Sequence, residues 1–360
     1  MLNTKINENF NANDVINSND LRKRILNIDS RFRTNCNDKA TDFSYSLEHS
    51  YKNIIRMRVA SVEIPNMWYN FSKAKKNVSF VVKAFDITGV PRAALIEIAE
   101  GNYTAQDIVI AIQDKLNENF RNPFGIFITI SLDISSAKVT FTHNGVASYP
   151  LANPTTDIPT DSAKPFILDF ISCPCYKNRL HNFGLGYYLG FRCKVYKASI
   201  SEVAAPVPPA TTGLTIYKIL PEACLDTVGD TYLFLAINDL HAVEQKTSDN
   251  YLQVLAKIIV REDKQSVIYD DGATLLSNEV IFPSPIDLRT LNIQLLDPFG
   301  EVVDLCGMNF SFSLEITEVL NTRLYDFYRN YIWMGSIPQV NYKKVVGAAQ
   351  PLLKGIGPPF

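Results

Sequence analysis

One pattern in the sequence could bind a metal ion. Cys173 and Cys175 are separated by a single residue, and His181 follows shortly after them. Cysteine pairs that bind zinc are usually separated by roughly two to four residues, and a fourth ligand would have to come from further along the chain, for example Cys193. A zinc site, a strained or transient disulfide and buried thiols all remain open, and buried thiols are the simplest interpretation. We therefore predict no metal ion and no cofactor.

Residues that could act in acid–base or nucleophilic catalysis are scattered along the chain. His143 precedes the turn dipeptide Asn144-Gly145, which predicts an exposed position beside a turn. The carboxylate pairs at 262–263 and 270–271 are typical of turns and solvated faces. None of the four histidines belongs to a recognisable nucleophile, zinc or base motif: His49, His143, His181 and His241. We predict that the protein is not an enzyme.

Signals for phosphate and nucleic-acid binding are weak. Gly184-Leu185-Gly186 resembles part of a phosphate-binding loop, but the YYLGFR that follows it is typical of a strand and supplies no helix N-terminus. Lys73, Lys75 and Lys76 follow aromatic residues, a combination that can bind single-stranded nucleic acid, although lysines at a sheet edge are the simpler interpretation. The net charge of -2 adds no general attraction to nucleic acid.

The elements that would position these residues are mostly strands. Apolar and polar residues alternate in about a dozen short segments, most clearly where Phe310, Phe312 and Leu314 alternate with serines. The predicted strands cover 43–47, 54–64, 78–85, 94–99, 126–132, 138–142, 232–237, 252–260, 279–282, 291–296 and 309–316.

A single internal helix is predicted over 104–119. Thr104 is a good N-cap, and Asp107 is placed to complete a capping box. Ile108, Ile112 and Leu116 form an apolar stripe that predicts packing against a sheet.

A hairpin is predicted near the end of the strand region. Asp297-Pro298-Phe299-Gly300 is a plausible β-turn. We expect the strand after Gly307 to return antiparallel to 291–296.

Composition indicates a folded chain of ordinary type. The 360 residues are 46% hydrophobic and 20% charged, which excludes disordered, collagen-like and coiled-coil classes. Six cysteines are too few for a disulfide scaffold, and the polar N-terminus does not resemble a signal peptide, so we expect synthesis in a reducing compartment. No apolar run is long enough to predict a transmembrane segment.

These patterns predict an all-β, antiparallel jelly-roll β-sandwich with one short internal helix, long loops and extended N- and C-terminal arms. Residues 1–40 are predicted to form an extended arm, 41–320 the jelly-roll domain and 321–360 an aromatic C-terminal arm. Loop insertions are expected at about 146–165 and 204–230, where proline is dense.

Aromatic residues crowd the C-terminal arm, and a neighbouring chain is the simplest cover for them, although they could also fold back on their own domain. Trp68 and Tyr69 form a second aromatic pair. The interface candidates are therefore Tyr325, Phe327, Tyr328, Tyr331, Trp333, Phe360, Trp68 and Tyr69.

Several phrases, taken in order, resemble the jelly-roll minor capsid and penton (vertex) proteins of large icosahedral nucleocytoplasmic double-stranded DNA viruses. No single phrase is diagnostic, and the resemblance rests on the set, which extends over 27–318. The phrases are Asn27–Arg33, Phe43–Leu47, Ile55–Asn66 leading to Trp68-Tyr69-Asn70, Ile96–Thr104, Leu189–Phe191, and Leu296–Gly300 through Asp304–Asn309 to Ser311–Ile316.

The resemblance implies a virion structural protein, either the penton at the fivefold vertex or a minor capsid protein beneath the major capsomers. It implies assembly in the host cytoplasm, with partners that are copies of the chain itself, as a pentamer or other homo-oligomer, the major capsid protein and other minor capsid proteins. The alternative is a lectin-like or receptor-binding β-sandwich that would use Trp68, Tyr69, Tyr187 and Tyr188 as exposed aromatic contacts.

Overall fold

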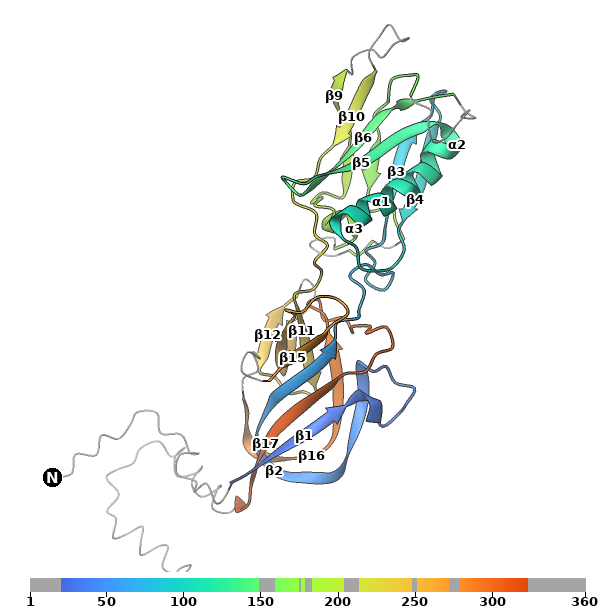
Figure 1. Cartoon of the computed structure of the whole chain (residues 1–360). Coiled ribbons are helices and arrows are strands. Elements are labelled where there is room, and N and C mark those ends of the chain that lie inside the picture. Colours follow the sequence, from blue (N-terminus) through green and yellow to red (C-terminus); the bar gives the residue numbers. More distant parts are fainter. Residues whose placement is uncertain are drawn as a thin grey trace, which may run out of the picture.

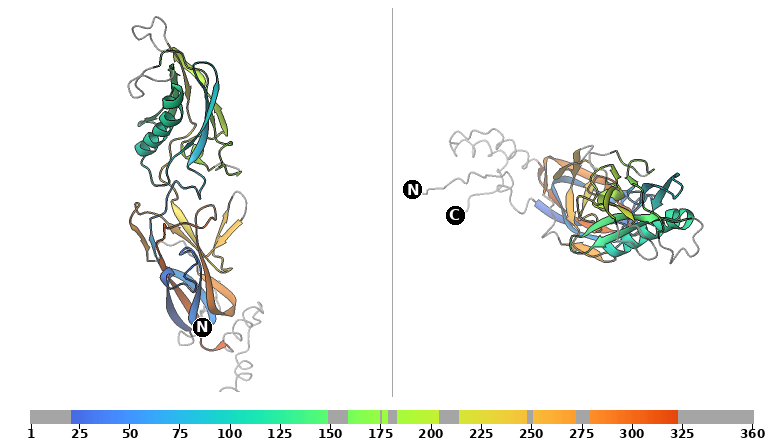
Figure 2. Two further views of the ribbon diagram at one scale, coloured as in Figure 1. Left: turned by 90° about the vertical axis from the view of Figure 1, so that its right-hand side faces the viewer. Right: turned by 90° about the horizontal axis from the view of Figure 1, so that it is seen from above.

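The protein folds into two β-rich lobes that stand end to end in both side views (Figures 1 and 2). The computed structural model describes residues 21–148, 159–174, 176–178, 183–203, 214–247, 251–271 and 279–322. We call 21–69 and 231–322 the terminal lobe, and 70–230 the inserted lobe because it interrupts the first. Every described strand ladder is antiparallel, which confirms the predicted all-β jelly-roll class.

The terminal lobe is built on one curled sheet with the strand order β1-β17-β2-β16-β11-β14, to which β15 adds on β2. A separate ladder joins β12 to β13. Its elements are β1 (Leu21–Asp29), a 3-10 turn (Ser30–Phe32), β2 (Asp42–Pro65), β11 (Tyr232–Ile237), β12 (Val243–Lys246), β13 (Tyr251–Val254), β14 (Ala256–Ile259), β15 (Val267–Asp270), β16 (Val280–Leu296) and β17 (Ser311–Val319).

The inserted lobe contains two four-stranded sheets, ordered β4-β3-β7-β8 and β5-β6-β10-β9. The second predicted loop insertion, 204–230, contains strand β10 in its described part. The elements are β3 (Ser79–Phe85), β4 (Pro91–Glu97), α1 (Ala105–Leu116), a π-helical turn (Asn117–Arg121), α2 (Asn122–Phe124), β5 (Ile126–Asp133), β6 (Lys138–Val146), β7 (Ile167–Asp169), α3 (Leu185–Tyr188), β8 (Val195–Lys197), β9 (Ser199–Val203) and β10 (Thr215–Ile219).

Strand β2 is the longest element, and it joins two segments that the sequence predicts separately, 43–47 and 54–64. Its length lets it pair with three strands: β16 along its first half, and β17 and β15 on opposite sides of its last residues. Asn53, between the two predicted segments, has a positive φ of 57° and marks an irregular point where the pairing with β16 shifts register.

The predicted hairpin after Asp297 is wrong in its pairing. The β-turn is present, because the amide of Gly300 donates to the carbonyl oxygen of Asp297 at 3.0 Å. The chain then makes only a short bridge back to β16, at Leu296 and Val302, before it crosses to the far side of β2. Strands β16 and β17 therefore flank β2 and do not pair with each other, since β2 offers an edge to each.

Part of the predicted N-terminal arm is a strand. Residues 21–29 form β1, which pairs with β17 from Leu21–Val319 to Asp29–Ser311. Leu26 and Ile28 are buried in the core of the terminal lobe, and this burial offsets the entropy of ordering the segment. Residues 1–20 lie outside the described residues.

The buried side chains form two main clusters where the sequence suggests a single domain over 41–320. One cluster lies in the terminal lobe around Met57, Ile293 and Phe312. The other lies in the inserted lobe around Phe80 and Phe141. The inserted lobe begins in mid-chain without any change of composition, so no sequence boundary marks it.

The predicted helix is confirmed. Thr104 Oγ1 accepts a hydrogen bond from the amide of Asp107 at 3.2 Å. The Asp107 carboxylate in turn accepts a hydrogen bond from the backbone amide of Thr104, so the capping box is complete. Ile108, Ile112 and Leu116 are buried, and α1 lies along the sheet (Figure 1).

Two local predictions in the inserted lobe are wrong. His143 is fully buried within β6, not exposed beside a turn, because β6 continues through Asn144-Gly145, with a bulge at Asn144 between the pairs His143–Ile128 and Gly145–Phe127. Its Nδ1 lies 2.8 Å from the carbonyl oxygen of Lys164, and burial lowers its pKa. The Gly184-Leu185-Gly186 segment starts the short helix α3, not a strand, and Gly186 lies so close to the ring of Phe170 that a larger side chain would clash there.

Replacing Thr104 with alanine removes the cap and should lower the free energy of unfolding by about 1 kcal/mol. Thr104→Ser retains the hydroxyl and serves as the matched control, with an expected change near zero. Denaturant unfolding of both variants measures the difference. Equal stability of Thr104→Ala and the unmodified protein would contradict the assigned cap.

Candidate interaction surfaces and the lobe junction

The cysteines and histidines considered above as metal ligands or catalytic groups do not come together in the described part of the chain. Cys173 is buried with its Sγ 3.7 Å from the carbonyl oxygen of Phe170, while Cys193 is exposed on another segment. Cys175 and His181 lie outside the described residues. Over the ranges that the structure covers, no group of three or more His, Cys, Asp or Glu side chains could hold a metal ion. Nor does any described helix have the length and apolar character needed to cross a membrane.

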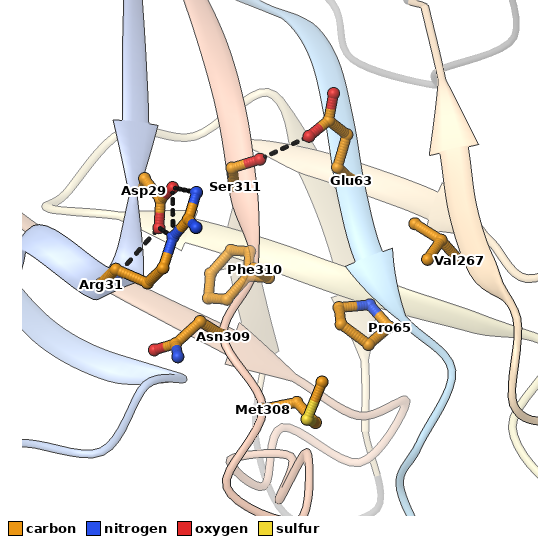
Figure 3. A pocket seen from close by; sticks show the side chains of 9 residues that line it. All are labelled: Asp29, Arg31, Glu63, Pro65, Val267, Met308, Asn309, Phe310 and Ser311. Atoms are coloured by element: carbon orange, nitrogen blue, oxygen red, sulfur yellow. Dashed lines mark hydrogen bonds and ion pairs between the residues drawn. The ribbon is translucent and has the colours of Figure 1, made fainter.

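A groove of about 310 Å³ opens on the sheet of the terminal lobe where four strands lie side by side (Figure 3). Asp29 of β1 pairs with Ser311 of β17, and Ser311 pairs with Glu63 of β2, so three polar side chains line up across the sheet. Ser311 Oγ donates to Glu63 Oε2 at 2.8 Å. Val267 of β15 and Met308 complete the wall (Figure 3).

The charged end of the groove is fixed by one tight pair. The backbone amide and the guanidinium of Arg31 both donate to the Asp29 carboxylate, with distances of 2.9 Å to Oδ1 and 2.9 Å to Oδ2. The hydrogen bond from Arg31, together with its charge, lowers the pKa of Asp29 although burial opposes this. Asp29 therefore stays ionised at neutral pH and orients an otherwise exposed arginine.

The other end of the groove is apolar. Phe310 is buried beneath it and stacks against Phe312 with ring centroids 6.0 Å apart. Val267 is 57% exposed and Tyr269, two residues further on the same face of β15, is 62% exposed. Exposed apolar and aromatic side chains beside a charged rim are typical of a protein–protein contact surface. We call Val267, Tyr269 and Met308 the β15 patch.

Ion pairs on the sheet hold β1 in place. Glu315 of β17 accepts from Lys23 of β1 at 2.8 Å and from Arg58 of β2 at 2.7 Å, which lowers its pKa. Arg22 and Arg24 both reach Glu318. Each pair is partly exposed and stabilises little alone, but together they bridge three strands. The basic cluster of the N-terminal segment is thus neutralised by its own sheet.

Two asparagines clamp the chain where it crosses between the lobes. Asn66 Nδ2 donates to the carbonyl oxygens of Glu262 and Asp263, at 2.7 and 3.1 Å. Asn70 Nδ2 donates to the carbonyl oxygens of Thr227 and Val228, both at 3.0 Å. The outgoing segment is thereby tied both to the terminal lobe and to the returning segment.

Charged and aromatic contacts strengthen the same junction. Lys75 and Asp230 form an ion pair at 2.7 Å with little exposure of either side chain. Lys177 of the inserted lobe pairs with Glu301 of the terminal lobe at 2.8 Å, and the ring of Phe183 lies 4.4 Å from that of Phe299. The Lys177–Glu301 and Phe183–Phe299 contacts therefore connect a loop of the inserted lobe to a loop of the terminal lobe.

The structure corrects the interpretation of Trp68 as an exposed contact. Its side chain is only 1% exposed and belongs to the terminal-lobe core. Lys264 Nζ lies 4.1 Å from the Trp68 ring and donates to its carbonyl oxygen at 3.0 Å, and burial lowers the pKa of Lys264 to about 8. Tyr188 is also buried, whereas Tyr69 is exposed as predicted. Of the four aromatic residues expected to form exposed contacts, two are therefore buried, and Tyr187 is half-buried.

The remaining predicted contact residues have mixed outcomes. Lys73 and Lys75 are paired with Glu97 and Asp230, so the lysine cluster is largely neutralised within the chain. The aromatic residues of the C-terminal arm lie outside the described residues: Tyr325, Phe327, Tyr328, Tyr331, Trp333 and Phe360. The groove itself escapes sequence analysis, because its residues come from strands distant in the chain and carry no motif.

Neither a protein-family model nor a curated protein sequence matches this chain. Among solved structures, the SeMet-labelled mavirus penton protein is similar at 10% identity and a TM-score of 0.38, covering 83% of this chain and 100% of that chain. A chain of the Sputnik virophage structure is similar at 12% identity and a TM-score of 0.38, covering 82% of this chain and 98% of that chain. Identity and TM-score are low in both cases.

The stability of the protein should depend on pH through Asp297, which lies on the side of the terminal lobe that faces the junction. Its Oδ1 accepts the amides of Phe299 and Glu301 at 2.8 and 2.9 Å. Burial, with the negative charge of Asp230 nearby, raises its pKa to about 6. Folding therefore disfavours its charged form, and this group's favourable contribution to stability is lost as the pH rises from about 4 through about 6.

Asp297→Asn keeps the accepting oxygen and removes the charge. We expect the variant to be more stable than the unmodified protein at pH 8 by about 2 kcal/mol, with the advantage shrinking towards pH 4. Thermal or denaturant unfolding at both pH values measures it, with Asp304→Asn, at an exposed turn, as control. A variant that is less stable at pH 8 would contradict the assignment.

Proposed function

We propose that this chain is a structural protein of a virion, a capsid component of a large icosahedral double-stranded DNA virus. The carrying observation is where the resembling phrases lie. Asn27–Asp29, Ile55–Pro65 and Ser311–Ile316 are distant in sequence, yet they occupy β1, β2 and β17, three neighbouring strands of one sheet. These three phrases thus meet in a single structural unit, the sheet of the terminal lobe, whereas the phrases Ile96–Thr104 and Leu189–Phe191 contribute to the core of the inserted lobe. Because these residues build a sheet, their location supports a structural role for the phrases and not a catalytic one.

The described surface suits assembly. The β15 patch exposes apolar side chains beside a charged rim. The groove next to it is open, and its charged side chains already have partners within the chain, as in the Asp29–Arg31 pair. Such a surface can bury area against another protein without leaving unpaired charges. A non-enzymatic role is part of the proposal.

A penton position is our preference over a minor capsid position beneath the major capsomers. A ring of five identical chains needs two different surfaces that complement each other. The β15 patch is one candidate, and the aromatic C-terminal arm, with Tyr331 and Trp333, is the other. The remaining partners in the proposal are the major capsid protein and other minor capsid proteins, in a particle assembled in the host cytoplasm.

Polar substitution of the β15 patch should weaken self-association. In native mass spectrometry of the full chain, we expect a homo-oligomer, and Val267→Ser with Tyr269→Ser should raise the concentration needed for it by at least about tenfold, because apolar burial is lost. Both residues are exposed, so folding should be unaffected. Ile134→Ser, at an exposed turn of the inserted lobe, is the matched control.

A strictly monomeric unmodified chain would count against self-assembly. An oligomer that persists unchanged in the double variant would remove the β15 patch from the interface.

Removing the C-terminal arm tests whether the arm docks on a neighbouring chain or folds back on its own domain. A chain that ends at Leu320 retains β17 and should unfold at the same denaturant concentration as the full chain, but it should fail to form the oligomer. Tyr331→Ala with Trp333→Ala in the full chain should weaken assembly in the same direction. A large loss of stability on truncation would instead show that the arm packs on its own lobe.

A further inference from the structure

The two four-stranded sheets of the inserted lobe differ in the side chains that they present to solvent. The sheet β5-β6-β10-β9 shows polar residues on its outer face, for example in the row where Thr129 pairs with Thr142 and Thr142 pairs with Lys218. This is the usual pattern of an antiparallel sheet that has one face on the core and the other in water. The sheet β4-β3-β7-β8 departs from it.

The outer face of the sheet β4-β3-β7-β8 is mostly apolar. Phe80, Val82 and Leu168 of its inner face lie in the core of the inserted lobe. The residues that alternate with them point outward, and their cross-strand pairs form three rows. The rows are Leu95-Val81-Asp169-Val195, Ala93-Lys83-Ile167-Lys197 and Pro91-Phe85. We call the residues of these rows the outer sheet face.

Apolar side chains of the outer sheet face are open to solvent. Leu95 is 38% exposed and Val195 is 41% exposed, and Phe85 is exposed at the end of β3. The only carboxylate in the rows is Asp169, which accepts a hydrogen bond from Lys83 Nζ at 2.6 Å. Because this carboxylate already has its cation, a partner can cover the outer sheet face without leaving an unpaired buried anion.

The size of the outer sheet face indicates a partner that another contact already holds in place. Strands about 4.8 Å apart and rows about 6.8 Å apart give the face an area on the order of 300 Å². A stable complex between two separate proteins buries about 800 Å² on each partner. A neighbouring copy of the chain does not need that area here, because association through the terminal lobes brings the inserted lobes together at high effective concentration.

The exposed side of α1 complements the outer sheet face. The helix lies along one side of the inserted lobe (Figure 2). Ile110 is 58% exposed, and Asp107 and Asp114 lie three residues before it and four residues after it, on the same side of the helix. Lys115 is already paired with Glu118 at 2.6 Å. The two aspartates therefore leave this side of α1 negative around an exposed apolar side chain.

We propose that the outer sheet face of one copy packs on the exposed side of α1 in the next copy. Ile110 then contacts the apolar rows. Asp169 neutralises Lys83, so Lys197 supplies the positive charge that faces Asp114. A closed ring needs such a pair of unlike surfaces on every chain. This inference rests on the proposed self-assembly, and it adds a contact between inserted lobes to the contact through the β15 patch.

Zero-length cross-linking tests the contact directly. Isotope-labelled and unlabelled full chains are mixed as dilute monomers, concentrated until they assemble, and treated with a carbodiimide, which joins a lysine amine to a carboxylate that touches it. We expect cross-linked peptides that join Lys197 of one isotope to Asp114 of the other. Lys197→Gln and Asp114→Asn should each abolish them. The Lys115–Glu118 pair, which lies within one chain, is the internal control and should give cross-links of a single isotope.

Polar substitution measures how much the contact contributes to assembly. Leu95→Ser with Val195→Ser should raise the concentration needed for the homo-oligomer by at least about tenfold in native mass spectrometry, because apolar burial is lost. Ile110→Ser should act in the same direction from the other side of the contact. Ile134→Ser, at the exposed turn between β5 and β6, is the matched control and should assemble as the unmodified chain does.

The inference is overturned if the oligomer forms but its mixed-isotope cross-links are confined to the terminal lobes. It is equally overturned if the Leu95 and Val195 double variant assembles as well as the control. Either result leaves self-assembly through the β15 patch standing. A chain that forms no oligomer at any concentration would instead remove the proposed self-assembly, and this contact with it.

Discussion

The insertion of β17 between β1 and β2 is the constraint on which the rest of the structure depends. It places residues 311–319 against the second half of the long strand β2 and residues 21–29 against the other edge of β17, so the two ends of the described chain close one sheet. That closure buries Ile28, Phe312 and Ile316 in the terminal core and aligns Asp29, Ser311 and Glu63 across the groove. It also leaves the segment between β2 and β11 free to form a second lobe with its own core.

Sequence patterns predict local structure well where one segment decides it. The alternation in Phe310–Ile316 and the cap at Thr104 are determined by neighbouring residues, and both are observed as predicted. Patterns fail where distant segments compete. Strand β17 could satisfy its pattern beside β16 or beside β2, and only the packing of the whole sheet selects β2. Trp68 stands beside Tyr69 in a pair that we interpreted as an exposed aromatic contact, but the fold places Trp68 in the core beside Lys264.

The groove also depends on segments that are distant in the sequence. The groove draws residues from four strands and from the segment before β17, so it leaves no single motif in the sequence. Near-neutral net charge is consistent with the ion pairs on the sheet, where Glu315 and Glu318 neutralise the basic residues of β1. The terminal lobe thus exposes apolar side chains beside a charged rim, and the Asn66 and Asn70 hydrogen bonds tie the segment that crosses between the lobes.

Single-particle imaging of purified virions would decide whether this chain is, as we propose, a building block of a capsid. We expect density that fits the two lobes end to end within the shell, repeated around the fivefold vertices if the chain is the penton, with the β15 patch against a neighbouring chain. Purified particles that contain no copy of this chain would contradict it.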